Sequence, residues 1–232
     1  MAINVYWSEL DDEWLRATVP QEVRKTHFLT DAFQEIGITR CPATRDFLHN
    51  YYSLSSIYSY NIFLDSENQK CWSDLYDQNF FDCHVKIRSY RHRSLSFMMQ
   101  YIFFVEEESL LMSMHQPFLE DNIINNTCIL YPGQFDIGKW FRNFDFAFRL
   151  KKSVDKFVIN EKDIYAYVKF HTDEDINFIQ FRPSKELKDL VADVGKAKNY
   201  QTTKTYRSLE YRYESFSTKN LILQEIKKNI LT

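Results

Sequence analysis

The triplet His171-Thr172-Asp173 places an imidazole and a carboxylate two residues apart, and such a pair can supply two ligands of a 2-His-1-carboxylate iron site. A complete site needs a second imidazole. Because His171 is the last histidine of the chain, that ligand would come from upstream, from His115 or His84. Iron or another divalent metal held by His171, Asp173 and His115 is therefore one hypothesis. The interpretation that we favour is an acidic turn after a strand that ends at His171.

Residues 88–93 form the densest basic run of the chain, with one aromatic ring among the cations. Arg88, Arg91 and Arg93 could hold phosphates while Tyr90 stacks on a base, which makes nucleic-acid binding a second hypothesis. The whole chain has a formal net charge of −3 and so offers no general attraction to a polyanion. We therefore favour a solvated loop between two strands and do not expect a nucleic-acid partner.

Residues 132–142 contain two of the four glycines of the chain together with a proline and a tryptophan. This concentration of turn residues predicts a compact loop of defined shape. Its side chains Phe135, Lys139, Trp140 and Arg142 could contact a protein partner. The alternative, which we favour, is that the loop covers the open end of a β-sandwich.

No set of residues points firmly to catalysis. Four glycines cannot supply a dinucleotide fingerprint or a phosphate-binding loop, and the G-x-S-x-G motif of serine hydrolases is missing. Aromatic residues make up 17% of the chain, which favours a large buried core over disorder. The sequence therefore favours a protein that is not an enzyme.

The four cysteines are widely spaced, without a C-x-x-C pair, and we expect them to be reduced thiols in a cytoplasm. The first residues have no basic region followed by an apolar stretch, so we expect no signal peptide. The longest apolar run, residues 97–105, is far shorter than a membrane span, and no membrane partner is expected.

The pattern of the chain predicts a single domain, residues 1–232, built from three segments. Residues 1–55 look helical and mixed, with Trp7, Leu10 and Trp14 at helical spacing after a possible N-cap at Ser8. Residues 56–183 alternate with a period of two and form the β-sandwich core; within them, 157–159 and 164–170 look like a hairpin.

Residues 184–232 regain a helical period. Ser184 is the expected N-cap and Gly195 the expected stop of one helix, and a second helix starts near Thr218. We predict an α+β fold: an antiparallel jelly-roll-like β-sandwich with helical N- and C-terminal segments.

Three stretches carry a resemblance to a known group of proteins: residues 77–82 (DQNFFD), 132–142 and 165–181. They resemble an uncharacterised protein family of tailed bacteriophages, in particular marine, cyanophage-like ones. The strands around 159–181 also look like the closing strands of a jelly roll. The resemblance implies a viral origin, with the host cytoplasm or the virion as location, and it implies no specific activity.

These observations together predict a non-enzymatic phage protein that is a structural component or binds a host or phage protein, or its own copy. The alternatives are a metal-dependent jelly-roll enzyme of the cupin or oxygenase type, and a weak nucleic-acid binder. We expect no cofactor under the first hypothesis, and iron or another divalent metal under the enzyme alternative.

Overall fold

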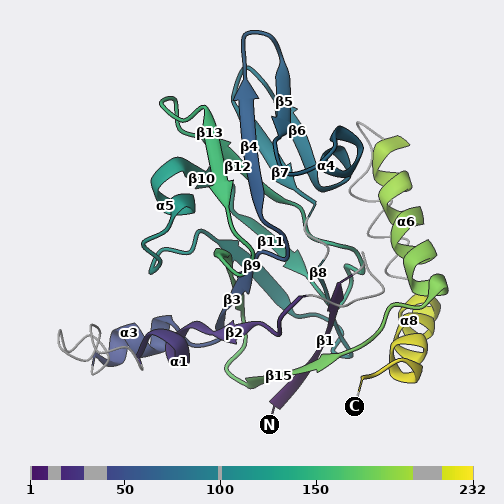
Figure 1. Cartoon of the computed structure of the whole chain (residues 1–232). Coiled ribbons are helices and arrows are strands. Elements are labelled where there is room, and N and C mark those ends of the chain that lie inside the picture. Colours follow the sequence, from purple (N-terminus) through teal and green to yellow (C-terminus); the bar gives the residue numbers. More distant parts are fainter. Residues whose placement is uncertain (1, 10–16, 29–40, 99–100, 201–215, 232) are drawn as a thin grey trace.

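The computed structural model describes residues 2–9, 17–28, 41–98, 101–200 and 216–231. The chain is a mixed α+β protein, mostly strands in several antiparallel sheets, with few helices. Figure 1 shows the sheets gathered in one body, with two helices along one side.

The described strands form four sheets, with the orders β15-β1-β8, β10-β12-β7-β6, β11-β9-β14-β3-β2 and β13-β4-β5. The strands are β1 Ala2–Glu9, β2 Gln21–Glu22, β3 Tyr51–Ser55, β4 Tyr60–Asp65, β5 Lys70–Ser73, β6 Val85–Ser89, β7 Ser94–Phe97, β8 Tyr101–Val105, β9 Leu111–His115, β10 Cys128–Leu130, β11 Gly133–Asp136, β12 Phe146–Leu150, β13 Lys156–Ile159, β14 Ile164–Phe170 and β15 Asp175–Gln180. The helices are α1 Val23–Phe28, α3 Pro42–Phe47, α4 Gln78–His84, α5 Ile123–Thr127, α6 Lys185–Tyr200 and α8 Phe216–Lys228. Among the described strand pairs, β1 with β15 is parallel and the others are antiparallel.

Ser8 is not the N-cap of a helix, because residues 2–9 form strand β1. This strand lies between β15 and β8, and its residues 5–9 are all buried. Val5 and Trp7 face the main core, whereas Tyr6 belongs to a second apolar cluster on the other side. Burial on both faces and pairing on both edges outweigh the helical spacing. Residues 10–16 and 29–40 of the expected helical segment lie outside the described residues.

The hairpin expected from residues 157–170 is also wrong in its pairing. Both strands exist, but β13 pairs with β4, and β14 pairs with β3 and β9. The turn between them packs instead on Ser56, whose N–H donates to the Asp163 carbonyl at 2.8 Å and whose carbonyl accepts from the Lys162 N–H at 2.8 Å. Alternation identifies strands, but it does not say which partner each strand takes.

The two expected C-terminal helices are present as α6 and α8. The Leu187 N–H donates to the Ser184 hydroxyl at 3.2 Å, which confirms the N-cap. Helix α6 runs on past Gly195 to Tyr200, so the expected stop is wrong. Leu187, Ile222 and Ile226 pack with residues of β1 and β8, which places α6 and α8 against the outer face of that sheet (Figure 1).

The main core is a single apolar cluster to which all four sheets contribute. Large rings fill it: Trp7 stacks on Tyr101, Tyr101 stacks on Phe103, and Phe103 contacts Phe170 edge to face. Within the described part of the chain, no helix is long and apolar enough to cross a membrane.

Candidate functional site on the outer face of a sheet

The five-stranded sheet β11-β9-β14-β3-β2 has two unlike faces. Met112, Met114 and Val168 point into the main core. On the opposite face, Ser113 lies directly across from Lys169 and His115 lies directly across from Tyr167. Because side chains alternate along a strand, this outer face carries a mixed polar and aromatic set, whereas the inner face is apolar.

Ser113 joins the two histidines of this face. Its hydroxyl oxygen lies 2.7 Å from Nε2 of His115 and 2.8 Å from Nε2 of His171. The backbone holds this arrangement, since the His171 N–H donates to the Leu111 carbonyl at 2.9 Å. The structure thus brings together His115 and His171, two of the three residues of the metal hypothesis, although they are 56 positions apart in the numbering.

The hydrogen-bond chemistry of this trio is constrained. A serine hydroxyl has one hydrogen, so it donates to one imidazole and must accept from an Nε2–H of the other. A donor aimed at the serine oxygen lowers its nucleophilicity, and the two imidazoles do not form the nucleophile, base and orienting group of a catalytic triad. Nε2 of both histidines therefore lies next to the same atom, the Ser113 hydroxyl oxygen.

Both imidazoles favour the neutral form. Burial lowers the pKa of His115, and the nearby His171 and Lys169 lower it further. Burial, followed by the charge of Lys169, also lowers the pKa of His171. Neutral imidazoles are the state that binds metals and accepts hydrogen bonds.

An aromatic patch lies beside the histidines on the same side of the sheet. Tyr51 of β3 contacts the His115 ring at 5.2 Å and the Phe118 ring at 5.7 Å, and Phe47 lies 5.9 Å from Phe118. Phe47 is 53% exposed and Phe118 43% exposed. The Lys169 ammonium lies over the rings of Phe47 and Tyr51 and donates to the Phe47 carbonyl at 3.2 Å. We call Phe47, Phe118, Tyr51 and Lys169 the aromatic patch.

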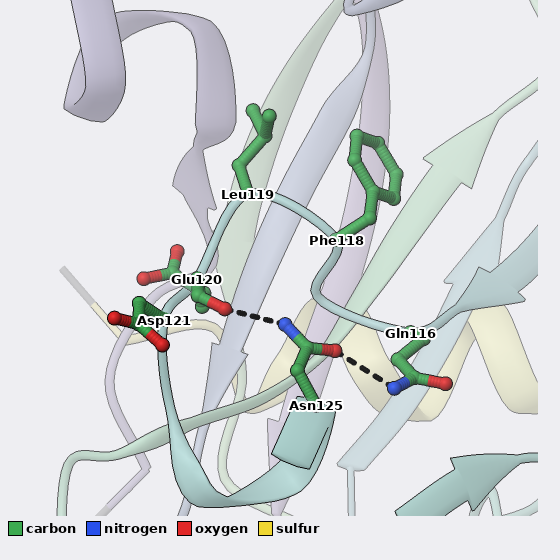
Figure 2. A pocket seen from close by; sticks show the side chains of 6 residues that line it. All are labelled: Gln116, Phe118, Leu119, Glu120, Asp121 and Asn125. Carbon is green, nitrogen blue, oxygen red and sulfur yellow. Dashed lines mark hydrogen bonds between the residues drawn. The ribbon is translucent and has the colours of Figure 1, made fainter.

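A shallow, open pocket of about 580 Å³ adjoins this patch, lined by residues 116, 118–121 and 125. Figure 2 shows Asn125 at its centre, with hydrogen bonds to Gln116 and to the Glu120 backbone. The Glu120 carboxylate accepts from the Tyr167 hydroxyl at 2.7 Å, and burial together with this contact raises the pKa of Tyr167. These hydrogen bonds hold in place the loop that lines the pocket, and Phe118 lies at the rim of the pocket.

Asp173, the third residue of the metal hypothesis, does not complete a site. Its side chain is exposed, and its carbonyl lies 3.4 Å from Nε2 of His49. The described residues contain no group of three or more His, Cys, Asp or Glu side chains that could hold a metal ion. The structure thus provides two converging imidazoles without a carboxylate.

The basic run lies in the β6–β7 hairpin, where intramolecular partners take up two of its charges. Arg88 pairs with Asp145 at 2.7 Å, and Arg93 pairs with Asp155 at 3.1 Å. Tyr90 packs against the main core, whereas Arg91 is exposed. Arg88 and Arg93 thus each have an acidic partner within the chain, and Tyr90 packs toward the core.

The 132–142 loop packs inward. Phe135 contacts Trp140 and Phe144, and Arg142 is only 8% exposed, with its guanidinium over the Trp140 ring. Lys139 lies 3.7 Å from Asp136 in a partly exposed ion pair. These contacts match a loop that covers the core, the alternative that we favoured over a partner-binding loop.

Sequence reasoning missed Ser113, Phe47 and Phe118. The sequence offers one indication of Ser113: it is a serine two residues before a histidine in an otherwise apolar strand. Nothing in the local sequence indicates that Phe47 and Phe118 meet, because they lie in a short helix and in a loop between strands. Comparison of the chain with protein-family models, curated proteins and solved structures gives no match.

Proposed function

We propose that the protein is a non-enzymatic binding module of bacteriophage origin that works in the host cytoplasm or in the virion. The partner is a host or phage protein, and the aromatic patch is the surface that binds it. We also propose that the four sheets form the walls of a jelly-roll-like sandwich around the shared core.

The observation that carries this proposal is that Phe47 and Phe118 are exposed and lie side by side, with their rings 5.9 Å apart. Large rings at a protein surface are typical anchors of protein interfaces, because they bury much area at little cost in side-chain entropy. Lys169 places a positive charge over the rings of Phe47 and Tyr51, and this charge favours a partner segment that combines apolar and acidic residues.

The filled interior supports the same proposal. Small-molecule sites are usually concave cavities lined by apolar residues and a few polar groups. Here the middle of the sandwich is occupied by stacked and tilted rings such as Phe97, Phe148 and Phe157. The phage origin rests on the resemblance of residues 77–82, 132–142 and 165–181.

The experiment compares three forms of the full chain: wild type, the double variant Phe47→Ser/Phe118→Ser, and the control Leu75→Ser. Leu75 is similarly exposed at 48%, but it lies between β5 and α4, away from the patch. Each form is immobilised and exposed to an extract of cells that express the protein, and bound proteins are quantified by mass spectrometry. Sedimentation of each form reports self-association.

We expect a partner, or a self-associated species, that is retained by wild type and Leu75→Ser and lost from the double variant. The proposal fails if binding is the same for the double variant and for wild type. It also fails if Leu75→Ser abolishes binding as completely as the double variant does.

A further inference from the structure

The geometry points to a binding site for one borderline transition-metal ion, Zn²⁺, Ni²⁺ or Cu²⁺, between His115 and His171. The carrying observation is that Nε2 of both imidazoles lies within 2.8 Å of the same atom, the Ser113 hydroxyl oxygen. Both contacts are hydrogen bonds to Ser113, so a bound ion would take the place of the Ser113 hydroxyl between the two Nε2 atoms. This inference does not depend on the proposed binding function and implies no reaction.

The identity of the ligands selects the metal. Imidazole nitrogen suits Zn²⁺, Ni²⁺ and Cu²⁺, whereas Mg²⁺ and Ca²⁺ require oxygen ligands. The described part of the chain holds no third His, Cys, Asp or Glu that joins the pair, so water completes the coordination. We therefore expect weaker binding than at a four-ligand structural zinc site.

The site is preorganised on both sides. His115 packs against the Tyr51 ring at 5.2 Å, and β9 is paired with β11 and β14 along its length. His171 follows directly after β14, and its N–H is bonded to the Leu111 carbonyl. Preorganised ligands lose little conformational entropy when an ion binds.

The charge of Lys169 opposes a bound cation, because the same charge lowers the pKa of both histidines. Its ammonium donates to the Phe47 carbonyl and lies over the rings of Phe47 and Tyr51, at 5.3 and 4.9 Å from their centroids. These contacts tether the positive charge to the aromatic patch, and its repulsion is a second reason to expect weak binding.

The test titrates the chelator-treated full chain with Cu²⁺ and Zn²⁺ separately. We expect one equivalent of each ion to bind, and the Cu²⁺ spectrum in electron paramagnetic resonance to show coupling to two nitrogen nuclei. His115→Gln and His171→Gln should each weaken binding by about tenfold or more, since each removes one of two protein ligands. The control His92→Gln removes an exposed histidine in the β6–β7 turn and should leave affinity unchanged.

A second measurement uses only the wild-type chain, so it holds even if a variant fails to fold. Zn²⁺ should protect His115 and His171, but not His92, from acylation by diethylpyrocarbonate, as read by peptide mass spectrometry. The inference is overturned if no ion binds, if both glutamine variants bind as well as wild type, or if His92 is protected and the pair is not.

Discussion

At the residue scale, Ser113 couples the protonation states of His115 and His171, because both rings are hydrogen-bonded to its hydroxyl. Each imidazole is placed where the neutral form is favoured, by burial and by the charge of Lys169. A proton added to either ring changes the hydrogen-bond pattern around a hydroxyl that serves both. The trio should therefore make the stability of the fold depend on pH in a range where carboxylates do not titrate.

The sign of that dependence follows from the lowered pKa values. Between the ordinary histidine pKa of 6.5 and the lower folded values, the unfolded chain binds more protons than the folded chain. The stabilisation is thus fully present above pH 6.5 and is lost as the pH falls through the folded pKa values. We expect urea midpoints of wild type to drop between pH 7.5 and pH 5 more than those of His115→Gln/His171→Gln. Equal drops in both proteins would contradict this account.

Gly138 provides a second prediction at this scale. A Cβ at this position would lie 2.8 Å from the carbonyl oxygens of both Glu107 and Glu108, and backbone atoms cannot move aside cheaply. We expect Gly138→Ala to lower the free energy of unfolding by about 1–3 kcal/mol. The matched control is Gly133→Ala, where the nearest atoms are ring carbons of Phe135 at 2.9 Å and 3.1 Å. Chemical denaturation should show a smaller loss for that control, and a reversed order would refute the steric argument.

The sequence predicted only in part which side chains meet at the candidate site. The pairing of His171 with His115 came from ligand chemistry and chain order, and the structure brings the two rings together. Asp173, the third residue of the metal hypothesis, does not join them, because proximity in sequence does not fix where a side chain points once a turn begins. The Phe47–Phe118 contact could not be predicted, since it depends on how a loop lies over a sheet.

At the scale of elements, Asn50 is the clearest example of a residue that joins two segments far apart in the sequence. It precedes β3 in the left-handed region, with φ 57°, and is buried. Its side-chain amide donates to the Thr172 carbonyl at 2.8 Å and to the Glu174 carbonyl at 2.9 Å. One residue thus fixes the start of β3 to the turn between β14 and β15.

Two substitutions of Asn50 separate its two roles. Asn50→Gly tolerates the positive φ and loses the side-chain hydrogen bonds to the two carbonyls and to the His49 ring, which we expect to cost about 1–3 kcal/mol. Asn50→Ala loses the bonds and also strains the backbone, for about a further 1 kcal/mol. Denaturant unfolding of both variants gives the difference. If Asn50→Ala were as stable as Asn50→Gly, the backbone at this position would carry no strain.

The hydrophobic pattern of the sequence predicted where strands and helices lie more reliably than it predicted which strands pair. The alternation around Tyr60, Ile62 and Leu64 is a strand with alternating burial, and Ser184 caps a real helix. Strand β1 was missed because Trp7 fits a helical spacing and a strand equally well, and only its two neighbouring strands decide between them. The partners of β13 and β14 are likewise set by the tertiary arrangement.

Thiol reactivity provides a prediction at the scale of the whole molecule. Burial raises the pKa of Cys128 to about 12 and that of Cys71 to about 12, whereas Cys41 and Cys83 are exposed. Hydrogen bonds from Thr44 lower the pKa of Cys41, which makes it the more reactive of the exposed pair.

We therefore expect an excess of a thiol reagent to label Cys41 first and Cys83 next in the native protein. Cys71 should follow slowly, and Cys128 should react only when the chain unfolds, because it is fully buried in the main core. Peptide mass spectrometry after timed quenching measures this order. Rapid native labelling of Cys128 would show that the core opens without global unfolding.

The parallel pairing of β1 with β15 has a consequence for synthesis. Asn4 and Asn177 face each other although 173 positions separate them, so β1 is synthesised long before the strand that closes this edge of its sheet. Until then an apolar edge stays open, and closure over such a distance is slow. Nascent chains halted before residue 175 should need a chaperone to stay out of aggregates.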